Sequence, residues 1–184
     1  MALVESSDIP LGSNMPPFSL PDPEGRVFNS WDCFGEQGLL VVFTCNHCPY
    51  AVAQWGRLIR LAQRARHLGV NTVAINPNIH PDYPQDAPEG MRELVGKLRI
   101  DFPYLVDGMQ KVARAFGAQC TPDPYLFNRD AELVYHGRID DNWQDEDAVT
   151  RHELWDAIEA LAAGEALEAQ QNPAMGCSIK WRKP

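Results

Sequence analysis

The stretch VVFTCNHCPYAVAQWGRL, residues 41–58, places two cysteines where an apolar run gives way to a helical pattern. The apolar run, residues 39–44, is rich in β-branched side chains, which is typical of a strand buried on both faces. Apolar residues then recur at helical spacing: Val52, Trp55, Leu58, Ile59, Ala62 and Ala65. They predict a helix over residues 51–68, and Gly69 is a plausible end for it.

Residues 70–76 repeat the pattern of a buried strand, so strand, helix and strand predict a βαβ unit with the two strands parallel. After a proline-rich loop, the chain predicts a helix, a short extended piece and a second short helix, over residues 89–98, 102–107 and 110–118. Residues 122–128 and 132–140 predict an antiparallel hairpin. This order of elements favours a mixed sheet with helices on both faces.

The two ends of the chain suggest additions to one domain. The predicted division is an irregular N-terminal arm over residues 1–14, a domain over residues 15–165, and a C-terminal tail packed on the domain over residues 166–184. The domain begins with a β-hairpin around the turn Pro-Asp-Pro-Glu-Gly. Its final helix is predicted to start with a capping box, Thr150 with Glu153, and to end at Gly164.

Composition narrows the classes of function. The 184 residues carry a formal net charge of -9 and are 45% hydrophobic, which fits one globular domain whose acidic surface repels nucleic acid. No apolar run approaches the roughly 20 residues of a membrane helix, so no membrane partner is expected. The first residues hold acids and prolines where a signal peptide has a basic end and an apolar stretch. We therefore predict a cytoplasmic protein without cofactor or metal.

Cys45 and Cys48 stand at the predicted junction of strand and helix. Backbone N–H groups at a helix start stabilise a thiolate and lower its pKa, and a helical turn places both thiols on one side. His47, if protonated, adds a positive charge that makes the disulfide more oxidising. Pro49 disfavours helical dihedrals at Cys48, so an alternative is a helix that begins only at Pro49.

Other uses of a cysteine pair need different neighbours. A structural zinc site usually shows a second pair of ligands, whereas Cys120 and Cys177 stand alone in the sequence. Haem attachment needs a histidine directly after the second cysteine, and that residue is Pro49. Two buried, inert thiols are the simplest alternative. A redox pair is favoured, because C-x-x-C at a βα junction in a cytosolic protein is a good indicator of redox chemistry.

Six separated motifs extend the pattern along the chain: TCNHCPY, INPN…YPQDAPEGM, FPYLVD, TPDPYLF, YHGRIDD and GCSIKW. In this order they resemble a C-x-x-C-containing group of thioredoxin-fold, peroxiredoxin-like proteins in the alkyl hydroperoxide reductase and thiol-specific antioxidant superfamily. The resemblance covers nearly everything from about residue 16 to residue 183. It implies an α/β, thioredoxin-like fold, in which a central mixed β-sheet is flanked by helices and carries an N-terminal β-hairpin extension.

The resemblance also implies which residues form the site. Cys45 and Cys48 would be the redox pair, and Pro122 would match the cis-proline that faces the cysteines in this fold. The neighbouring residues would tune the pair or shape a groove for a substrate chain: Asn46 and His47 for tuning, Thr121 and Pro122 for the groove.

The sequence departs in two ways from the patterns of these families, so the resemblance does not by itself imply an activity. Peroxiredoxins carry P-x-x-x-T/S-x-x-C, but the residue three before Cys48 is Cys45, and the residue three before Cys45 is Val42. Many thioredoxins keep a buried acid on the strand before the cysteines, and residues 38–44 contain none. His47 or a solvent-side group must then handle the protons.

The other three cysteines receive different interpretations. Cys120 precedes Thr121, so the resemblance places it near the active face, as a packed residue or a further redox thiol. Cys177 lies in a specific tail motif and either returns to the pair as a third redox thiol or anchors the tail by packing. Cys33, beside Trp31 and Phe34, is predicted to belong to the core.

Charged residues outside the pair have structural interpretations. His136 is predicted to be a surface or packing residue, and Arg138 with Asp140 to form an ion pair. Arg57 belongs to an arginine row on the solvated face of the first helix. The acidic residues 140–147 lack the glycine and the distal glutamate of a calcium loop, and acids before a helix start explain them.

The first functional hypothesis is a thiol–disulfide oxidoreductase in which Cys45 attacks and Cys48 resolves. Its substrate would be a disulfide-bearing protein or a small thiol, and an external reductant, the thioredoxin or glutathione system, would recharge it. A thiol-dependent peroxidase, resolved by the neighbouring cysteine or by Cys177, is the second hypothesis. A non-catalytic metal-thiolate protein is the third.

Overall fold

A computed structural model describes residues 3–167 and 171–182. Its main sheet has five strands in the order β6-β5-β4-β8-β9. The central strand β4 (Gly38–Phe43) pairs in parallel with β5 (Val70–Asn76), as predicted, and antiparallel with β8. The outer strands complete a mixed sheet: β6 (Tyr104–Val106), β8 (Asp123–Asn128) and β9 (Leu133–His136). The thioredoxin-like α/β fold is thereby confirmed.

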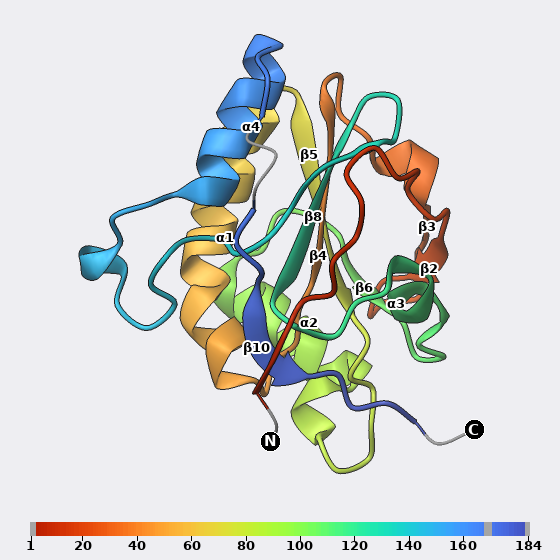
Figure 1. The fold of residues 1–184 in the computed structure, drawn as a ribbon. Coiled ribbons are helices and arrows are strands. Elements are labelled where there is room, and N and C mark those ends of the chain that lie inside the picture. The colour runs from red at the N-terminus through yellow and green to blue at the C-terminus, as the bar shows by residue number, and fades with distance from the viewer. Residues whose placement is uncertain (1–2, 168–170, 183–184) are drawn as a thin grey trace.

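Alternate residues of β4 serve two hydrophobic cores, because successive side chains of a strand point to opposite faces. Leu40 and Val42 face the first core, which is covered by three helices: α1 (Pro49–His67), α2 (Pro88–Leu98) and α4 (Glu153–Ala163). Leu39, Val41 and Phe43 face the second core, toward α3 (Lys111–Phe116). Figure 1 shows α1 and α4 on one side of the sheet and α3 on the other.

The predicted N-terminal hairpin consists of β2 (Ser19–Pro21) and β3 (Val27–Asn29), paired antiparallel. Asp22 stabilises its turn, because one carboxylate oxygen accepts hydrogen bonds from the N–H groups of Glu24 and Arg26. Three single-turn 3-10 helices connect other elements: Ser30–Cys33, Pro84–Asp86 and Glu146–Ala148. Among the described residues, no helix is long and apolar enough to cross a membrane.

The two ends of the chain meet in a second, three-stranded sheet of order β1-β10-β7. The strands are β1 (Leu3–Glu5), β10 (Met175–Ser178) and β7 (Cys120–Thr121). Figure 1 shows β10 beside the N-terminal strand, below the main sheet. The prediction of an irregular arm over residues 1–14 is therefore wrong at Leu3–Glu5, because the strand that pairs with it lies at the other end of the sequence.

Two predicted local contacts are also wrong. Helix α4 begins at Glu153 with His152 as N-cap, so there is no capping box. The Thr150 hydroxyl donates to Asp141, and the Glu153 carboxylate accepts instead from Arg138 Nε at 2.9 Å. Arg138 is thus not paired with Asp140.

The partner of Asp140 is Arg57, which the helix pattern had placed on a solvated face. Arg57 Nη1 lies 2.6 Å from Asp140 Oδ2, and both side chains are buried. The same guanidinium donates to the carbonyl oxygens of Asn142 and Trp143. The loop after β9 therefore folds over α1 and buries one arginine of the row.

Candidate redox site

The two cysteines occupy the turn between β4 and α1. Strand β4 ends at Phe43, and α1 begins at Pro49 with Cys48 as its N-cap in an extended conformation, φ -72° and ψ 123°. The alternative of a helix that starts only at Pro49 is therefore confirmed. Cys48 is therefore next to the first N–H groups of α1, which have no partner within the helix, although its side chain makes no capping hydrogen bond.

Both sulfur atoms pack against the residues before β8. Cys45 Sγ lies 3.3 Å from Thr121 Oγ1, and Cys48 Sγ lies 3.2 Å from the Thr121 carbonyl oxygen. The Thr121-Pro122 peptide bond is cis, as the resemblance implied. Cys45 and Cys48 are each 0% exposed.

A third thiol reaches the same place from the end of the chain. Cys177 stands opposite Thr121 in the pairing of β10 with β7, and Thr121 contacts the sulfur atoms of both Cys45 and Cys48. Cys45, Cys48 and Cys177 form one buried cluster with Ala51. Of the two positions left open by the sequence, the structure thus places Cys177 at the pair.

The other cysteines lie apart from this cluster. Cys120 Sγ points at the carbonyl oxygens of Pro122, at 3.8 Å, and of Ala174, at 4.0 Å, and burial raises its pKa. Cys33 belongs to the core on the other face of the sheet, as predicted, and burial raises its pKa to about 11. Both are protonated at neutral pH.

The three clustered thiols differ in charge. The hydrogen bond from the Cys45 thiol, together with those from the Cys177 thiol and the Ala51 N–H, outweighs burial and lowers the pKa of Cys48 to about 4. Burial and the bond to Cys48 raise the pKa of Cys45 well above its usual value and that of Cys177 to about 12. The Thr121 carbonyl favours a protonated Cys48, but the converging donors outweigh it. These interactions favour Cys48 as the thiolate of the cluster.

The strand before the cysteines carries no buried acid, but the loop after β5 supplies one, Asp86. Asp86 Oδ1 accepts from the Asn46 N–H at 2.6 Å and from Asn76 Nδ2 at 3.0 Å, and Oδ2 contacts His47 Nδ1. The His47 ring also stacks on Tyr83, with 4.1 Å between ring centroids. Asp86 adds to the rise in the pKa of Cys45. A sequence signal for it existed, since Asp86 lies in the YPQDAPEGM motif.

A second buried carboxylate follows the cis-proline. Asp123 Oδ1 lies 2.8 Å from His136 Nε2, and Asp123 Oδ2 accepts from the Tyr125 hydroxyl at 3.1 Å. The rings of Tyr125 and His136 stack, with centroids 4.0 Å apart. His136 is therefore buried within a polar network of the β8–β9 hairpin, and the packing interpretation holds.

Within the described residues, one group of side chains converges as metal ligands do. The ligand atoms of Cys45, His47 and Asp86 lie within 4.8 Å of one another. The His47–Asp86 contact and the amide donors on Asp86 already use these groups, and a high pKa keeps Cys45 protonated. A hydrogen-bond network accounts for their convergence without an ion.

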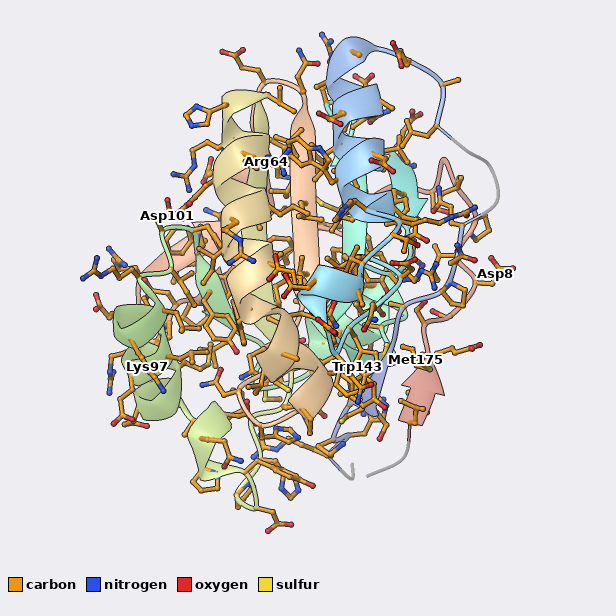
Figure 2. All side chains as sticks on the ribbon, turned by 90° about the vertical axis from the view of Figure 1, so that its left-hand side faces the viewer. Asp8, Arg64, Lys97, Asp101, Trp143 and Met175 are labelled. Atoms are coloured by element: carbon orange, nitrogen blue, oxygen red, sulfur yellow. The ribbon has the colours of Figure 1, made fainter. Side chains whose placement is uncertain are left out.

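A pocket lies beside the buried thiols. Pro122, Gln54, Trp143 and Met175 line it, so it borders the cis-proline and β10. The Trp143 ring also lies against Tyr50 in the first turn of α1, with centroids 3.9 Å apart. Figure 2 shows Trp143 and Met175 close together on one side of the molecule. The predicted groove at Thr121 and Pro122 corresponds to this pocket only at Pro122, because Thr121 is fully buried.

Comparison with known proteins agrees with this geometry. The family model described as Redoxin matches residues 10–153. The chain belongs to the Redoxin family. No match was found among the curated proteins.

Among solved structures, an uncharacterized conserved protein from Geobacillus kaustophilus is 40% identical, with a TM-score of 0.95, over 100% of this chain and 98% of that one. A hypothetical protein from Sinorhizobium meliloti 1021 is 36% identical, with a TM-score of 0.92, over 98% and 99%. A peroxidoxin from Mycobacterium tuberculosis is 16% identical, with a TM-score of 0.62, over 85% and 98%, and shares the fold.

Membership of the Redoxin family indicates thiol oxidoreductase or peroxidase activity and is consistent with thiol substrates and reductant partners in general.

Proposed function

We propose that this Redoxin is a thiol–disulfide oxidoreductase in which Cys48 and Cys45 alternate between dithiol and disulfide. The observation that carries the proposal is the position of Cys48 at the start of α1, where donors from Cys45, Cys177 and Ala51 lower its pKa to about 4. A thiolate is the nucleophile of disulfide exchange, whereas a thiol is not.

The reaction follows from these protonation states. The Cys48 thiolate attacks one sulfur of a disulfide substrate, so a mixed disulfide forms and the first thiolate leaves. Cys48 then no longer carries the charge that held the Cys45 proton, and the pKa of Cys45 falls. Asp86, with an oxygen within 4.8 Å of Cys45 Sγ, is placed to take that proton through a water. Cys45 attacks Cys48 Sγ and releases the second thiol, which completes a two-electron reduction.

The proposed setting is a reducing cytoplasm, where an external reductant of the thioredoxin or glutathione system returns the pair to the dithiol. Membership of the Redoxin family is consistent with thiol substrates and reductant partners in general, which supports the external reductant but not the cellular compartment. The direction of electron flow follows from the reduction potential of the pair relative to that reductant.

An equilibrium titration tests the proposal. The protein is incubated in dithiothreitol buffers of graded redox potential, trapped by alkylation in denaturant, and mapped cysteine by cysteine. Cys45 and Cys48 are expected to oxidise together in one two-electron step, while Cys33 stays alkylated throughout and serves as an internal control. A pair that stays reduced, or loses its thiols independently, would contradict a dithiol site.

A thiol peroxidase is the second candidate, and the complete burial of both sulfurs favours it, because a small peroxide reaches such a site more easily than a protein disulfide does. The Cys48 thiolate and a proton would reduce the peroxide to an alcohol or water and form a sulfenic acid, which Cys45 would resolve with loss of water. Peroxide consumption driven by dithiothreitol and lost in Cys48→Ser would identify this activity. Disulfide reduction without peroxide consumption would leave the first candidate.

A further inference from the structure

The C-terminal strand holds its cysteine at the site by backbone contacts. Cys177 pairs with Thr121 of β7 on one edge and with Leu3 of β1 on the other. Directly after the strand, the Ile179 N–H donates to the Gln119 carbonyl at 2.9 Å. A Cβ added at Gly176 would lie 2.1 Å from the Thr121 carbonyl oxygen, so β10 lies against the residues that face the thiols. The position of Cys177 is fixed by the register of a sheet.

This placement makes the strand a cover over the pair. Cys45 and Cys48 have no exposed surface, and Cys177 is 4% exposed. Cys177 packs with Cys45 and Cys48 in one buried cluster, and its interaction with Cys48 helps to lower the pKa of Cys48. Cys48 thus contacts two thiols, Cys45 from its own turn and Cys177 from the far end of the chain.

We propose that Cys177 is a third redox thiol that forms a disulfide with Cys48 in competition with Cys45, and that this disulfide ties β10 across the site. The proposal rests on the proposed function, because it needs Cys48 to react with a disulfide first. A disulfide of glutathione class, RSSR, supplies the oxidising equivalents.

The step balances as an ordinary exchange. The Cys48 thiolate attacks RSSR, forms Cys48–SR and releases RS⁻, which takes the proton of Cys177. The Cys177 thiolate attacks Cys48 Sγ, forms the Cys48–Cys177 bond and releases the second RS⁻. Two electrons pass from the two protein thiols to RSSR. Cys45 can later attack Cys48 and release Cys177, which frees the strand and leaves the Cys45–Cys48 disulfide.

Electrostatics around Cys177 agrees with this role. The Lys180 ammonium lowers the pKa of Cys177, partly offsetting burial, whereas Asp86 raises the pKa of Cys45. Cys120 is equally buried and is the neighbour of Thr121, but its thiol points at carbonyl oxygens. It therefore provides a matched control that should take no part.

Tryptic mapping after reaction with oxidised glutathione tests the proposal. Cleavage at arginine and lysine leaves Cys33, Cys45 and Cys48 on the peptide of residues 27–57, Cys120 on residues 115–129 and Cys177 on residues 152–180, and fragment spectra assign a cross-link to Cys48 rather than Cys33. In Cys45→Ser, we expect residues 27–57 to become cross-linked to residues 152–180. In Cys45→Ser/Cys177→Ser, we expect complete loss of this cross-link and a lasting glutathione adduct on Cys48. Cys45→Ser/Cys120→Ser is expected to match Cys45→Ser.

A lasting glutathione adduct on Cys48 in Cys45→Ser, without the cross-link, would overturn the role of Cys177 and leave the proposed function standing. Failure of both wild type and Cys45→Ser to form any adduct or disulfide at Cys48 would overturn both. Since Cys45→Ser alters a buried side chain, wild type is mapped in parallel under limiting glutathione disulfide. The cross-linked peptides are expected there beside the Cys45–Cys48 disulfide, and their absence from folded wild type and variant alike would count against the proposal.

Discussion

Cys48→Ser is expected to lower the rate of disulfide reduction by about 100-fold or more at neutral pH. The variant removes the effect of Cys48 on Cys45, but burial and the Asp86 carboxylate still raise the pKa of Cys45, so its thiol stays mainly protonated at pH 7. Cys45→Ser is expected to keep the first step, because Cys48 retains the Cys177 thiol and the Ala51 N–H as donors. The measurement is stopped-flow release of the first thiol from a chromogenic disulfide by prereduced protein.

The comparison of the two serine variants decides the order of attack. Rapid thiol release by Cys48→Ser, with none from Cys45→Ser, would restore the order predicted from sequence, in which Cys45 attacks. Cys120→Ser is the control for replacing a buried cysteine. Its rate and amount of first-thiol release are expected to match those of wild type.

Arg57→Met is expected to lower the free energy of unfolding by about 3–5 kcal/mol, because it leaves the Asp140 carboxylate buried without its partner. The side chains of Arg57 and Asp140 are 8% and 3% exposed, and the guanidinium also holds two loop carbonyls. For a chain of this size, such a loss lowers the Tm by roughly 6–20 °C. Urea unfolding followed by circular dichroism measures it.

Arg60→Met provides the matched control on the same helix. Arg60 pairs with Glu146, but these side chains are 56% and 54% exposed, so the expected cost is below about 1 kcal/mol. Equal losses for the two variants would show that the loop after β9 does not depend on the buried pair. Because Trp143 of this loop packs against Tyr50, Arg57→Met is also expected to loosen the packing of the loop against the start of α1.

The βαβ unit and the position of the two cysteines between strand and helix could be predicted because their signals are local. The apolar runs of β4 and β5 are long enough to bury a strand, and Pro49 fixes where α1 begins. The sheet of the two chain ends could not be predicted, since β1 has three residues and pairs with β10 near the other terminus. Strands that short carry no periodic pattern of their own.

The polar partners were missed for a related reason. Asp86 reaches His47 from a loop beyond β5, and Asp140 reaches Arg57 from a loop beyond β9. Helical periodicity shows which face of α1 is apolar, but not which loop covers its polar side. The sequence assigned the attack to Cys45 because it placed that residue at the helix start. In the structure α1 begins at Pro49, and the interactions that lower a pKa act on Cys48, so we propose the reverse order.

The central claim, that Cys48 is a thiolate at neutral pH, is tested most directly by the ultraviolet absorbance of thiolates against pH in the reduced protein, with Cys48→Ser as the blank. A pKa lowered in the folded state means that the thiolate persists above that pKa and is lost only as pH falls through it. The difference absorbance is therefore expected to rise with a midpoint near pH 4 and to be complete by neutral pH. A first step only above pH 8, the ordinary range of a cysteine, would contradict the account.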